Sequence, residues 1–349
     1  ALVEQAQKSQ AACTILTAQA ANPCGYGRIV RNAEGLVAGI VEEKDATGEQ
    51  KQINEINTGT YFFDWQLLQE ALAELTNDNA PGEYYLTDTI SWLVKQGRKV
   101  NAMVCPDFQE AMGVNDRVQL AVADKALRTR KIKDLQLRGV TVQDPSNTYI
   151  DLDVEVGMDT VIYAGCHLQG RTIIGGNCEI GPDTQLTDTK VGDDCKIVRT
   201  VTNDVTIGQA ANIGPFAYLR PGTVLEDNVK VGDFVELKKS HIGAGSKVPH
   251  LSYLGDSEVG GQVNIGCGTI TCNYDGFRKF PTTIEAGAFI GSNSNLVAPV
   301  KIGANAYVAA GSTITKDVPA DDLAIARGRQ RNLEGRGKEL REKLRSENK

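Results

Sequence analysis

The sequence predicts a parallel β-helix preceded by a mixed α/β domain, and three observations carry the prediction. Aliphatic residues recur at a period of about six from Val156 to Ile314, nearly half of the chain. Glycine makes up 36 of 349 residues, above the usual ~7%, and often follows those aliphatic residues directly. Aromatic residues are scarce, with 8 Phe, 10 Tyr and 2 Trp. A narrow core of stacked aliphatic side chains accounts for all three.

The six-residue period is strict in three runs and continues at steps of five or six between the second and third. Those positions are Val156, Ile162, Leu168, Ile174, Ile180 and Leu186; Ile207, Ile213, Leu219, Leu225, Val231 and Leu237; Ile242, Val248, Leu254, Val259 and Ile265; and Ile284, Ile290, Leu296, Ile302, Val308 and Ile314. Such a period fits a short strand plus a turn, with the aliphatic side chain inside. Three hexapeptides close a triangular coil of about 18 residues. We therefore expect eight or nine coils, about 40 Å long at ~4.8 Å per coil.

Two further features belong to the repeat. Small residues lie four positions after many of the aliphatic residues, as at Thr184, Ala217, Ser246, Ser294 and Ala306, and we expect glycine to permit the tight corners. The segment 272–283 (CNYDGFRKFPTT) breaks the period, so it predicts a loop that projects from the prism. Loops on a rigid scaffold are common sites of function.

The other segments complete a four-part organisation: an α/β domain at 1–115, a linker helix at 116–139, the β-helix at 140–326 and a basic tail at 327–349. In the first part we expect strands at 11–16 and 36–41, and helices capped by Asp64 and Thr87. The linker helix carries an apolar stripe of Leu120, Ala123 and Leu127 and stops at Gly139. Residues 140–153 predict an irregular entry to the repeat, and 333–347 a frayed helix.

Charge and cysteine usage exclude several protein classes. The net charge is −7, but the tail carries nine Lys/Arg against four acidic residues, so the rest is strongly acidic and unsuited to general nucleic-acid binding. The tail is either a ligand-phosphate contact or a solvated charged segment. The eight cysteines form no CxxC pair, which indicates reduced thiols in the cytoplasm. No apolar run approaches 18 residues, so no membrane insertion is expected.

Several motifs resemble one bacterial family. They are GPFAYLRPG (214–222), VELKK (235–239), HLSYLGD (250–256) and NIGCGTITCNYDG (264–276), preceded by GYGRIV (25–30), IVEEKDA (40–46), EINTGTY (55–61), GEYYLTD (82–88) and GVNDR (113–117). The chain resembles the bifunctional N-acetylglucosamine-1-phosphate uridyltransferase/glucosamine-1-phosphate N-acetyltransferases along essentially its whole length. The resemblance implies a left-handed β-helix, a homotrimer, and synthesis of UDP-N-acetylglucosamine for cell-wall and lipopolysaccharide precursors.

The implied acetyl transfer from acetyl-CoA to glucosamine 1-phosphate needs a base for the amine, and histidine suits that task. His250 lies in the matching motif and is the expected base, while Glu236 either holds its imidazole or binds the sugar. The resemblance implies sugar-phosphate contacts at Arg220, Lys238, Tyr253, Asn264 and Lys279, and acetyl-CoA contacts at Cys267, Asn273, Tyr274, Ser292, Ala310 and Arg327. Cys267 replaces an alanine, as either a covalent acyl carrier or a buried thiol that fills the site.

The resemblance also implies a UDP-N-acetylglucosamine site in the first domain, with contacts at Gly27, Glu42, Asn57, Tyr85, Thr87 and Asn115. Asn115 is the expected Mg²⁺ ligand, together with an aspartate that lies before Ala1 in the family pattern. The family's Gly-rich loop, LAAGxGTRM, is also missing. We therefore expect no uridylyl transfer by this polypeptide alone.

Three alternatives remain at this point. A zinc carbonic anhydrase on a β-helix needs three histidines at one subunit interface, and the chain has only His167, His241 and His250. A sugar nucleotidyltransferase with a merely regulatory or oligomerising β-helix lacks its Gly-rich loop here. A purely structural solenoid leaves the polar insertion unexplained, with its Asn273, Tyr274 and Lys279.

Overall fold

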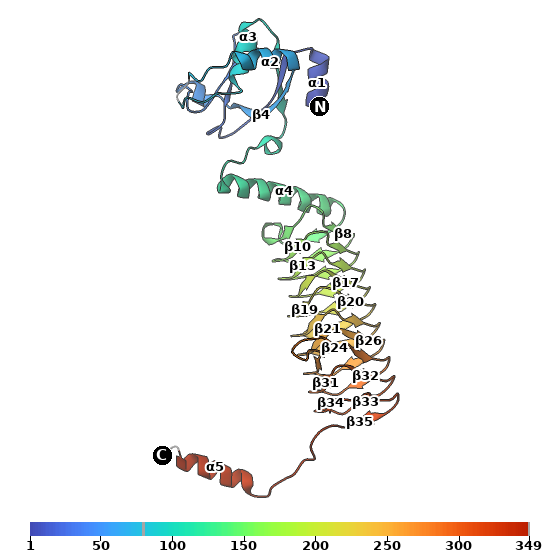
Figure 1. Cartoon of the computed structure of the whole chain (residues 1–349). Coiled ribbons are helices and arrows are strands. Elements are labelled where there is room, and N and C mark those ends of the chain that lie inside the picture. Colours follow the sequence, from blue (N-terminus) through green and yellow to red (C-terminus); the bar gives the residue numbers. More distant parts are fainter. Residues whose placement is uncertain (79–80, 348–349) are drawn as a thin grey trace. The chain divides into compact units, whose positions relative to one another are not determined.

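The computed structural model describes residues 1–78 and 81–347 and divides into two compact units, 1–126 and 127–349. The first unit is built on a five-stranded sheet, which we call sheet A (Figure 1). Its strands, in spatial order, are β3 (Val37–Val41), β2 (Arg28–Arg31), β4 (Glu55–Phe63), β1 (Cys13–Gln19) and β5 (Val100–Cys105). β1 and β5 are parallel and the other pairs are antiparallel. The two strands predicted from the sequence are β1 and β3; the other three lie in segments without a prediction.

The helical segments of the first unit are α1 (Leu2–Ser9), α2 (Trp65–Ala73), α3 (Asp88–Lys95) and the 3₁₀ turns η1 (Gln50–Gln52) and η2 (Phe108–Ala111). Asp64 caps α2 as predicted, because its carboxylate accepts a hydrogen bond from the Leu67 amide at 3.1 Å. The predicted cap by Thr87 is wrong. Thr87 precedes α3, but its hydroxyl donates to the Glu42 carboxylate at 2.9 Å instead of accepting from the helix.

The helix between the two parts is α4 (Arg117–Leu137). Its buried residues are Ile132 and Leu135, which join the core of the second unit. The predicted stripe is wrong, since Leu120 and Leu127 are exposed. Only the last turns of α4 pack on the prism, so the buried apolar positions lie closer to the C-terminal end of the helix than the predicted stripe.

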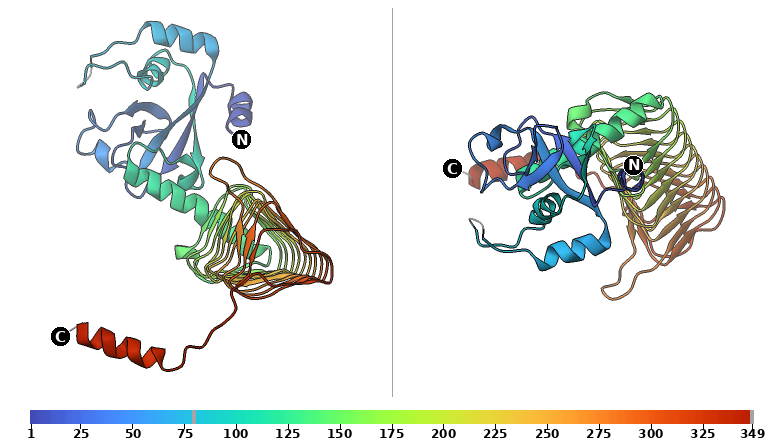
Figure 2. Two further views of the ribbon diagram at one scale, coloured as in Figure 1. Left: turned by 60° about the horizontal axis from the view of Figure 1, so that its bottom comes forward. Right: turned by 90° about the horizontal axis from the view of Figure 1, so that it is seen from above.

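The second unit is a prism of three parallel sheets that the chain visits in turn (Figures 1 and 2). Sheet B contains β6 (Thr141–Val142), β9 (Val161–Ile162), β12 (Glu179–Ile180), β15 (Lys196–Ile197), β18 (Asn212–Ile213), β21 (Lys230–Asp233), β24 (Lys247–His250), β27 (Asn264–Ile265), β30 (Phe289–Ile290), β33 (Tyr307–Val308) and β35 (Leu323–Ala324). Sheet C contains β7 (Tyr149–Ile150), β10 (His167–Gln169), β13 (Gln185–Thr187), β16 (Val201–Asn203), β19 (Tyr218–Leu219), β22 (Glu236–Lys238), β25 (Tyr253–Gly255), β28 (Ile270–Cys272), β31 (Asn295–Val297) and β34 (Thr313–Ile314). Sheet D contains β8 (Glu155–Val156), β11 (Ile173–Ile174), β14 (Lys190–Val191), β17 (Val205–Ile207), β20 (Thr223–Leu225), β23 (His241–Ile242), β26 (Ser257–Val259), β29 (Thr282–Ile284) and β32 (Val300–Ile302).

The prism confirms the predicted β-helix and the inward aliphatic residues, which form one continuous buried core. The small residues also point inward, and Thr184 and Ser246 are buried with their hydroxyls bonded to backbone carbonyls. The prism is slightly longer than expected, because the sheets hold nine to eleven strands. Residues 140–153 are not a wholly irregular entry: β6 and β7 already pair with the next coil, with the 3₁₀ turn η3 (Pro145–Asn147) between them.

The role of glycine in the repeat differs from the expectation. Most glycines that follow an inward aliphatic residue have ordinary φ, but a side chain there would collide with the next coil. A Cβ on Gly157 would lie 2.6 Å from the Gly175 carbonyl carbon, and one on Gly243 would lie 2.5 Å from that of Gly260. The left-handed conformation falls instead at the corners, where Asp and Asn are common. Close approach between coils, rather than turning freedom, therefore explains these glycines.

Two segments leave the prism. The predicted loop lies between β28 and β29 and projects from the coils (Figure 2). After β35 the chain ends in α5 (Arg336–Glu347), the helix predicted for the tail, which has no buried residue.

Candidate functional site

The corner between sheets B and C stacks the expected base and several expected coenzyme contacts in one column. Asp233, His250, Cys267, Ser292 and Ala310 each lie three residues before a sheet C strand, in successive coils. The pairing of β21 with β24 sets Asp233 opposite His250, and β24, β27, β30 and β33 then pair in sequence. Parallel register therefore brings together residues that are 17 to 25 positions apart in the chain.

The imidazole of His250 is held by Asp233. The Nδ1 atom lies 2.7 Å from Asp233 Oδ1, and this hydrogen bond is the main cause that lowers the pKa of the Asp233 carboxyl. An ionised carboxylate only accepts hydrogen bonds, so Nδ1 carries the hydrogen, and in the neutral imidazole Nε2 is the nitrogen with the free lone pair. The His250 side chain is 56% exposed, which leaves Nε2 open to a ligand.

Glu236 does not hold the imidazole, which corrects one of its two expected roles. Its carboxylate pairs with the Arg220 guanidinium at 2.9 Å, on the outer surface of sheet C. Strand register explains the difference: Glu236 lies opposite Tyr218 and Tyr253, whereas Asp233 lies opposite His250.

Cationic side chains gather beside this pair on sheet C. Lys238 is one residue past the inward Leu237, and its side chain is largely buried. The neighbouring ammonium of Lys279, from the projecting loop, is the main cause that lowers the pKa of Lys238, followed by burial. The nearest carboxylate oxygen belongs to Asp256, 3.8 Å away. Two ammonium groups held together with incomplete neutralisation favour an anionic ligand.

Gly255 leaves room for two more of the expected contacts. A Cβ at this position would clash with the Tyr253 hydroxyl and would lie 2.7 Å from the Asn273 amide nitrogen. Asn273 is buried, and its amide donates to Asp256 at 2.6 Å. Tyr253, Asn273 and the lysine pair therefore surround the same stretch of β25.

The remaining expected contacts fall into two groups. Cys267 is half-buried, while Ser292 and Ala310 are exposed, and Arg327 donates to the Ala310 carbonyl at 2.7 Å. Cys267 is thus not the fully buried thiol of one expectation. Asn264 lies on sheet B opposite Lys247 and Phe289. Tyr274 is exposed in the projecting loop, where its backbone forms an isolated antiparallel β-bridge with Lys279.

In the first unit, most of the expected nucleotide-sugar contacts lie close together. The Thr87 hydroxyl donates a hydrogen bond to the Glu42 carboxylate, and that carboxylate would lie 3.3 Å from a Cβ on Gly27. The Asn57 backbone amide donates to the Gly27 carbonyl at 2.8 Å. Tyr85 lies near Glu42, since that charge is among the causes that raise the pKa of the Tyr85 hydroxyl, after burial and the charges of Asp45 and Glu83.

Asn115, the expected Mg²⁺ ligand, lies just before α4. The backbone amide of Asn115 donates to the Gln119 side chain at 2.6 Å, and Gln119 is not an acidic metal ligand. Across residues 1–78 and 81–347, no three His, Cys, Asp or Glu side chains are arranged to hold a metal ion. No helix in the same ranges is long and apolar enough to cross a membrane.

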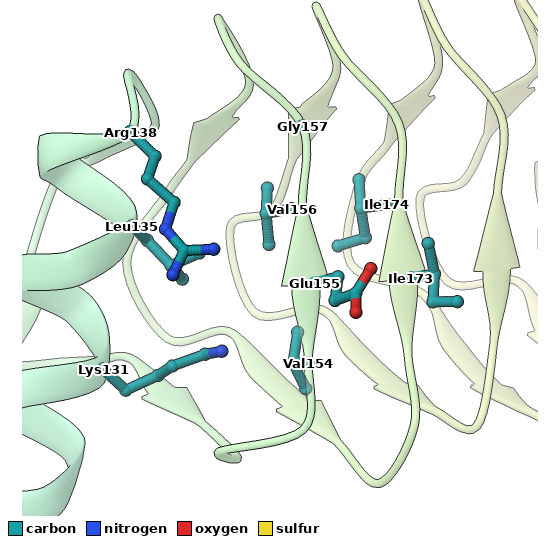
Figure 3. Close-up of a pocket in the computed structure, with 9 residues that line it drawn as sticks. All are labelled: Lys131, Leu135, Arg138, Val154, Glu155, Val156, Gly157, Ile173 and Ile174. Atoms are coloured by element: carbon teal, nitrogen blue, oxygen red, sulfur yellow. The ribbon is translucent and has the colours of Figure 1, made fainter.

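A separate pocket of about 370 Å³ lies between α4 and the first coils (Figure 3). It contains none of the expected site residues. Its two cations are already engaged, because Lys131 donates to the Leu152 carbonyl at 2.8 Å and Arg138 pairs with Asp134 at 2.7 Å.

Sequence reasoning missed Asp233 and Asp256, and one signal would have found both. In this part of the prism, residues 17 positions apart in the sequence occupy equivalent places in adjacent coils. Counting 17 residues back from His250 gives Asp233, and counting 17 back from Asn273 gives Asp256. The hexapeptide period places the side chains that face inward, but the coil length decides which outward side chains meet.

Comparisons with known proteins place both units. Residues 1–111 match the Nucleotidyl transferase family, and residues 204–239 and 281–316 match the Bacterial transferase hexapeptide family. The "Bifunctional protein GlmU" of Carboxydothermus hydrogenoformans is 55% identical over 96% of this chain and 75% of its own length. The protein of the same name from Geobacillus sp. is 53% identical over 96% of this chain and 73% of its own length. A solved UDP-N-acetylglucosamine O-acyltransferase from Moraxella catarrhalis is 20% identical and covers 46% of this chain and 68% of its own length, with a TM-score of 0.29.

Proposed function

The chain belongs to the bifunctional GlmU family, and from this premise we propose how its own residues carry out acetyl transfer. It is a glucosamine-1-phosphate N-acetyltransferase, which moves the acetyl group of acetyl-CoA to the amine of glucosamine 1-phosphate. The product, N-acetylglucosamine 1-phosphate, is the precursor for uridylyl transfer in UDP-N-acetylglucosamine synthesis.

In our proposal His250 is the general base, and the 2.7 Å bond from its Nδ1 to Asp233 is the observation that carries it. The amine nitrogen attacks the thioester carbonyl carbon while His250 Nε2 accepts the amine proton. The thioester carbon–sulfur bond then breaks, and the coenzyme thiolate takes a proton. Asp233 keeps the hydrogen on Nδ1 and stabilises the imidazolium that forms, as the acidic member of a catalytic triad does.

We assign the sugar phosphate to the cations of sheet C. A phosphate placed between Lys238 and Lys279 would neutralise the repulsion that lowers the Lys238 pKa, and Arg220 would supply a third cation. Glu236 orients Arg220 instead of acting on the base. Tyr253, Asn264 and Asn273 offer hydrogen bonds to the sugar and the acetyl group.

We assign acetyl-CoA to the column above His250. Cys267, Ser292 and Ala310 have small side chains at a corner, so an extended arm can lie against their backbone. Arg327, at the far end, would contact the coenzyme's phosphates. Tyr274 in the projecting loop would cover the reacting end.

Three further assignments follow the family. We propose a homotrimer, and a cytoplasmic location that the eight free thiols support. The cluster around Gly27 and Glu42 would contact UDP-N-acetylglucosamine. The zinc alternative finds no support, since His167, His241 and His250 lie on sheets C, D and B respectively.

Thiol release from acetyl-CoA in the presence of glucosamine 1-phosphate tests the proposal. We expect His250→Ala to lose at least ~10²-fold in kcat, the lower range for a general base. Val224→Asn, on sheet D at the level of the same coils, is the control and should keep the parent rate. An unchanged rate in His250→Ala would refute the assignment of the base.

A further inference from the structure

Asp256 lies at a corner of the prism and contacts the chain at both ends of the projecting loop. It directly follows β25, and its carboxylate accepts a hydrogen bond from the Asn273 side-chain amide at 2.6 Å. Its backbone carbonyl accepts from the Thr282 amide at 3.2 Å, where the chain rejoins the prism. One residue therefore holds both ends of the segment that projects from the coils (Figure 2).

The bond to Asn273 fixes more than one side chain. The Phe280 amide donates to the Asn273 carbonyl at 2.9 Å, and Tyr274 forms its β-bridge with Lys279. These backbone contacts fold the loop back on itself, so a fixed Asn273 also fixes the segment that carries Lys279. Asn273 is buried, whereas Phe277 in the middle of the loop is 93% exposed. The base of the loop is thus the part that packs on the prism.

The same carboxylate lies 3.8 Å from the Lys238 ammonium. A hydrogen bond is usually ~2.7–3.2 Å long, so this contact leaves Lys238 hydrogen atoms for a ligand. Lys279 and burial lower the pKa of Lys238, and the charge of Asp256 opposes them. An acidic side chain at this position therefore offsets part of the repulsion that arises when the loop brings Lys279 close to Lys238.

The left-handed corner alone does not account for these contacts. Aspartate tolerates that conformation, and Asp204 (φ 50°) and Asp256 (φ 51°) both directly precede a sheet D strand. Gly222 (φ 79°) occupies the same position in a coil between them, so the corner itself needs no side chain. The contacts of the Asp256 carboxylate with Asn273 and Lys238 are additional to the turn.

We propose that Asp256 is a positioning residue of the acetyl-transfer site, which fixes the projecting loop through Asn273 and so holds Lys279 beside Lys238 to receive the sugar phosphate. The inference deepens the proposed function and rests on it. Asp256 acts through the loop rather than on the substrate, because a carboxylate in contact with the phosphate would repel it.

Two substitutions separate the hydrogen bond from the charge. Asp256→Gly removes both and should keep the parent circular dichroism spectrum, because Gly222 occupies the equivalent position. We expect it to raise KM for glucosamine 1-phosphate ~10-fold and to change KM for acetyl-CoA less than ~3-fold, since the loop loses its charge-assisted hydrogen bond while the coenzyme column is untouched. Asp256→Asn keeps an acceptor for the Asn273 amide and should restore most of the affinity. Asp204→Gly and Asp204→Asn are the matched controls and should keep the parent KM values.

A double-mutant cycle distinguishes positioning from a merely structural role. In a Lys279→Met background, Asp256→Gly should change KM for glucosamine 1-phosphate less than ~3-fold, because the cation that the loop delivers is already absent. Additive effects of the two substitutions would overturn the proposal, as would a parent-like KM in Asp256→Gly.

Trypsin cleavage tests the anchor without relying on activity. The side chain of Arg278 in the loop is 75% exposed, and we expect cleavage after Arg278, followed by mass spectrometry, to be faster in Asp256→Gly than in the parent. Equal cleavage rates would overturn the anchoring of the loop, whatever the enzyme does. Absence of thiol release by the parent protein would instead remove the acetyl transfer on which the positioning role rests.

Discussion

Replacing Asp233 by asparagine separates the structural assignment of the site from the one that sequence reasoning favours. The Asp233 carboxylate holds His250 Nδ1 at 2.7 Å, whereas Glu236 is engaged with Arg220. An asparagine amide can donate to Nδ1 and thereby favour the tautomer with the hydrogen on Nε2, which cannot accept the amine proton.

The size of the effect follows from the charge-assisted hydrogen bond that the substitution removes. Hydrogen bonds to charged groups are stronger than neutral ones, and we expect the loss of this one, together with the change of tautomer, to lower kcat by about 10- to 100-fold. Glu236→Gln removes an ion pair whose two side chains are 38% and 40% exposed, and such a surface pair contributes ~0–1 kcal/mol. We therefore expect Glu236→Gln to change kcat by less than about 5-fold and to act mainly on KM.

The assay is steady-state thiol release at saturating acetyl-CoA, combined with ¹⁵N NMR of the imidazole. Asp233→Asn should shift the His250 tautomer as well as slow the reaction, and Asp233→Glu should restore part of the rate. A parent-like rate and tautomer in Asp233→Asn, with a large kcat decrease in Glu236→Gln, would refute the reasoning.

Three other predictions concern the anion site, the unusual thiol and the coil packing. Lys238→Met should raise KM for glucosamine 1-phosphate about 10- to 100-fold with kcat little changed. In the parent enzyme, the affinity for glucosamine 1-phosphate, measured by calorimetry, should fall as pH rises through the lowered Lys238 pKa, because the phosphate binds the charged amine. We expect Cys267→Ala to keep kcat within about 3-fold, because the thiol only lines the coenzyme column, and we expect no acetyl-enzyme in the parent by mass spectrometry. A burst of one thiol per chain in the parent that is absent from Cys267→Ala would instead identify Cys267 as an acyl carrier. Gly157→Ala should cost ~1–3 kcal/mol in urea unfolding because its Cβ would overlap the next coil, whereas Gly328→Ala, with nothing within 4 Å, should be neutral; equal midpoints would contradict the close-packing explanation.

The sequence by itself determined the β-helix and its inward face, and it singled out His250 as the proposed base. A six-residue aliphatic period has few structural solutions, so residues such as Ile162 and Leu168 were placed correctly in the core. The motif around His250 identified the family and its chemistry. Local signals were enough for the α2 cap at Asp64, since a cap involves only neighbouring residues.

Only the tertiary structure decided which outward side chains meet. Coil length varies where corners shorten or a loop is inserted, so the partner of His250 depends on register and proved to be Asp233. The crowding of Lys238 by Lys279 joins a strand to a projecting loop. The period, in short, places a residue inside or outside the prism, while contacts between coils depend on three-dimensional register.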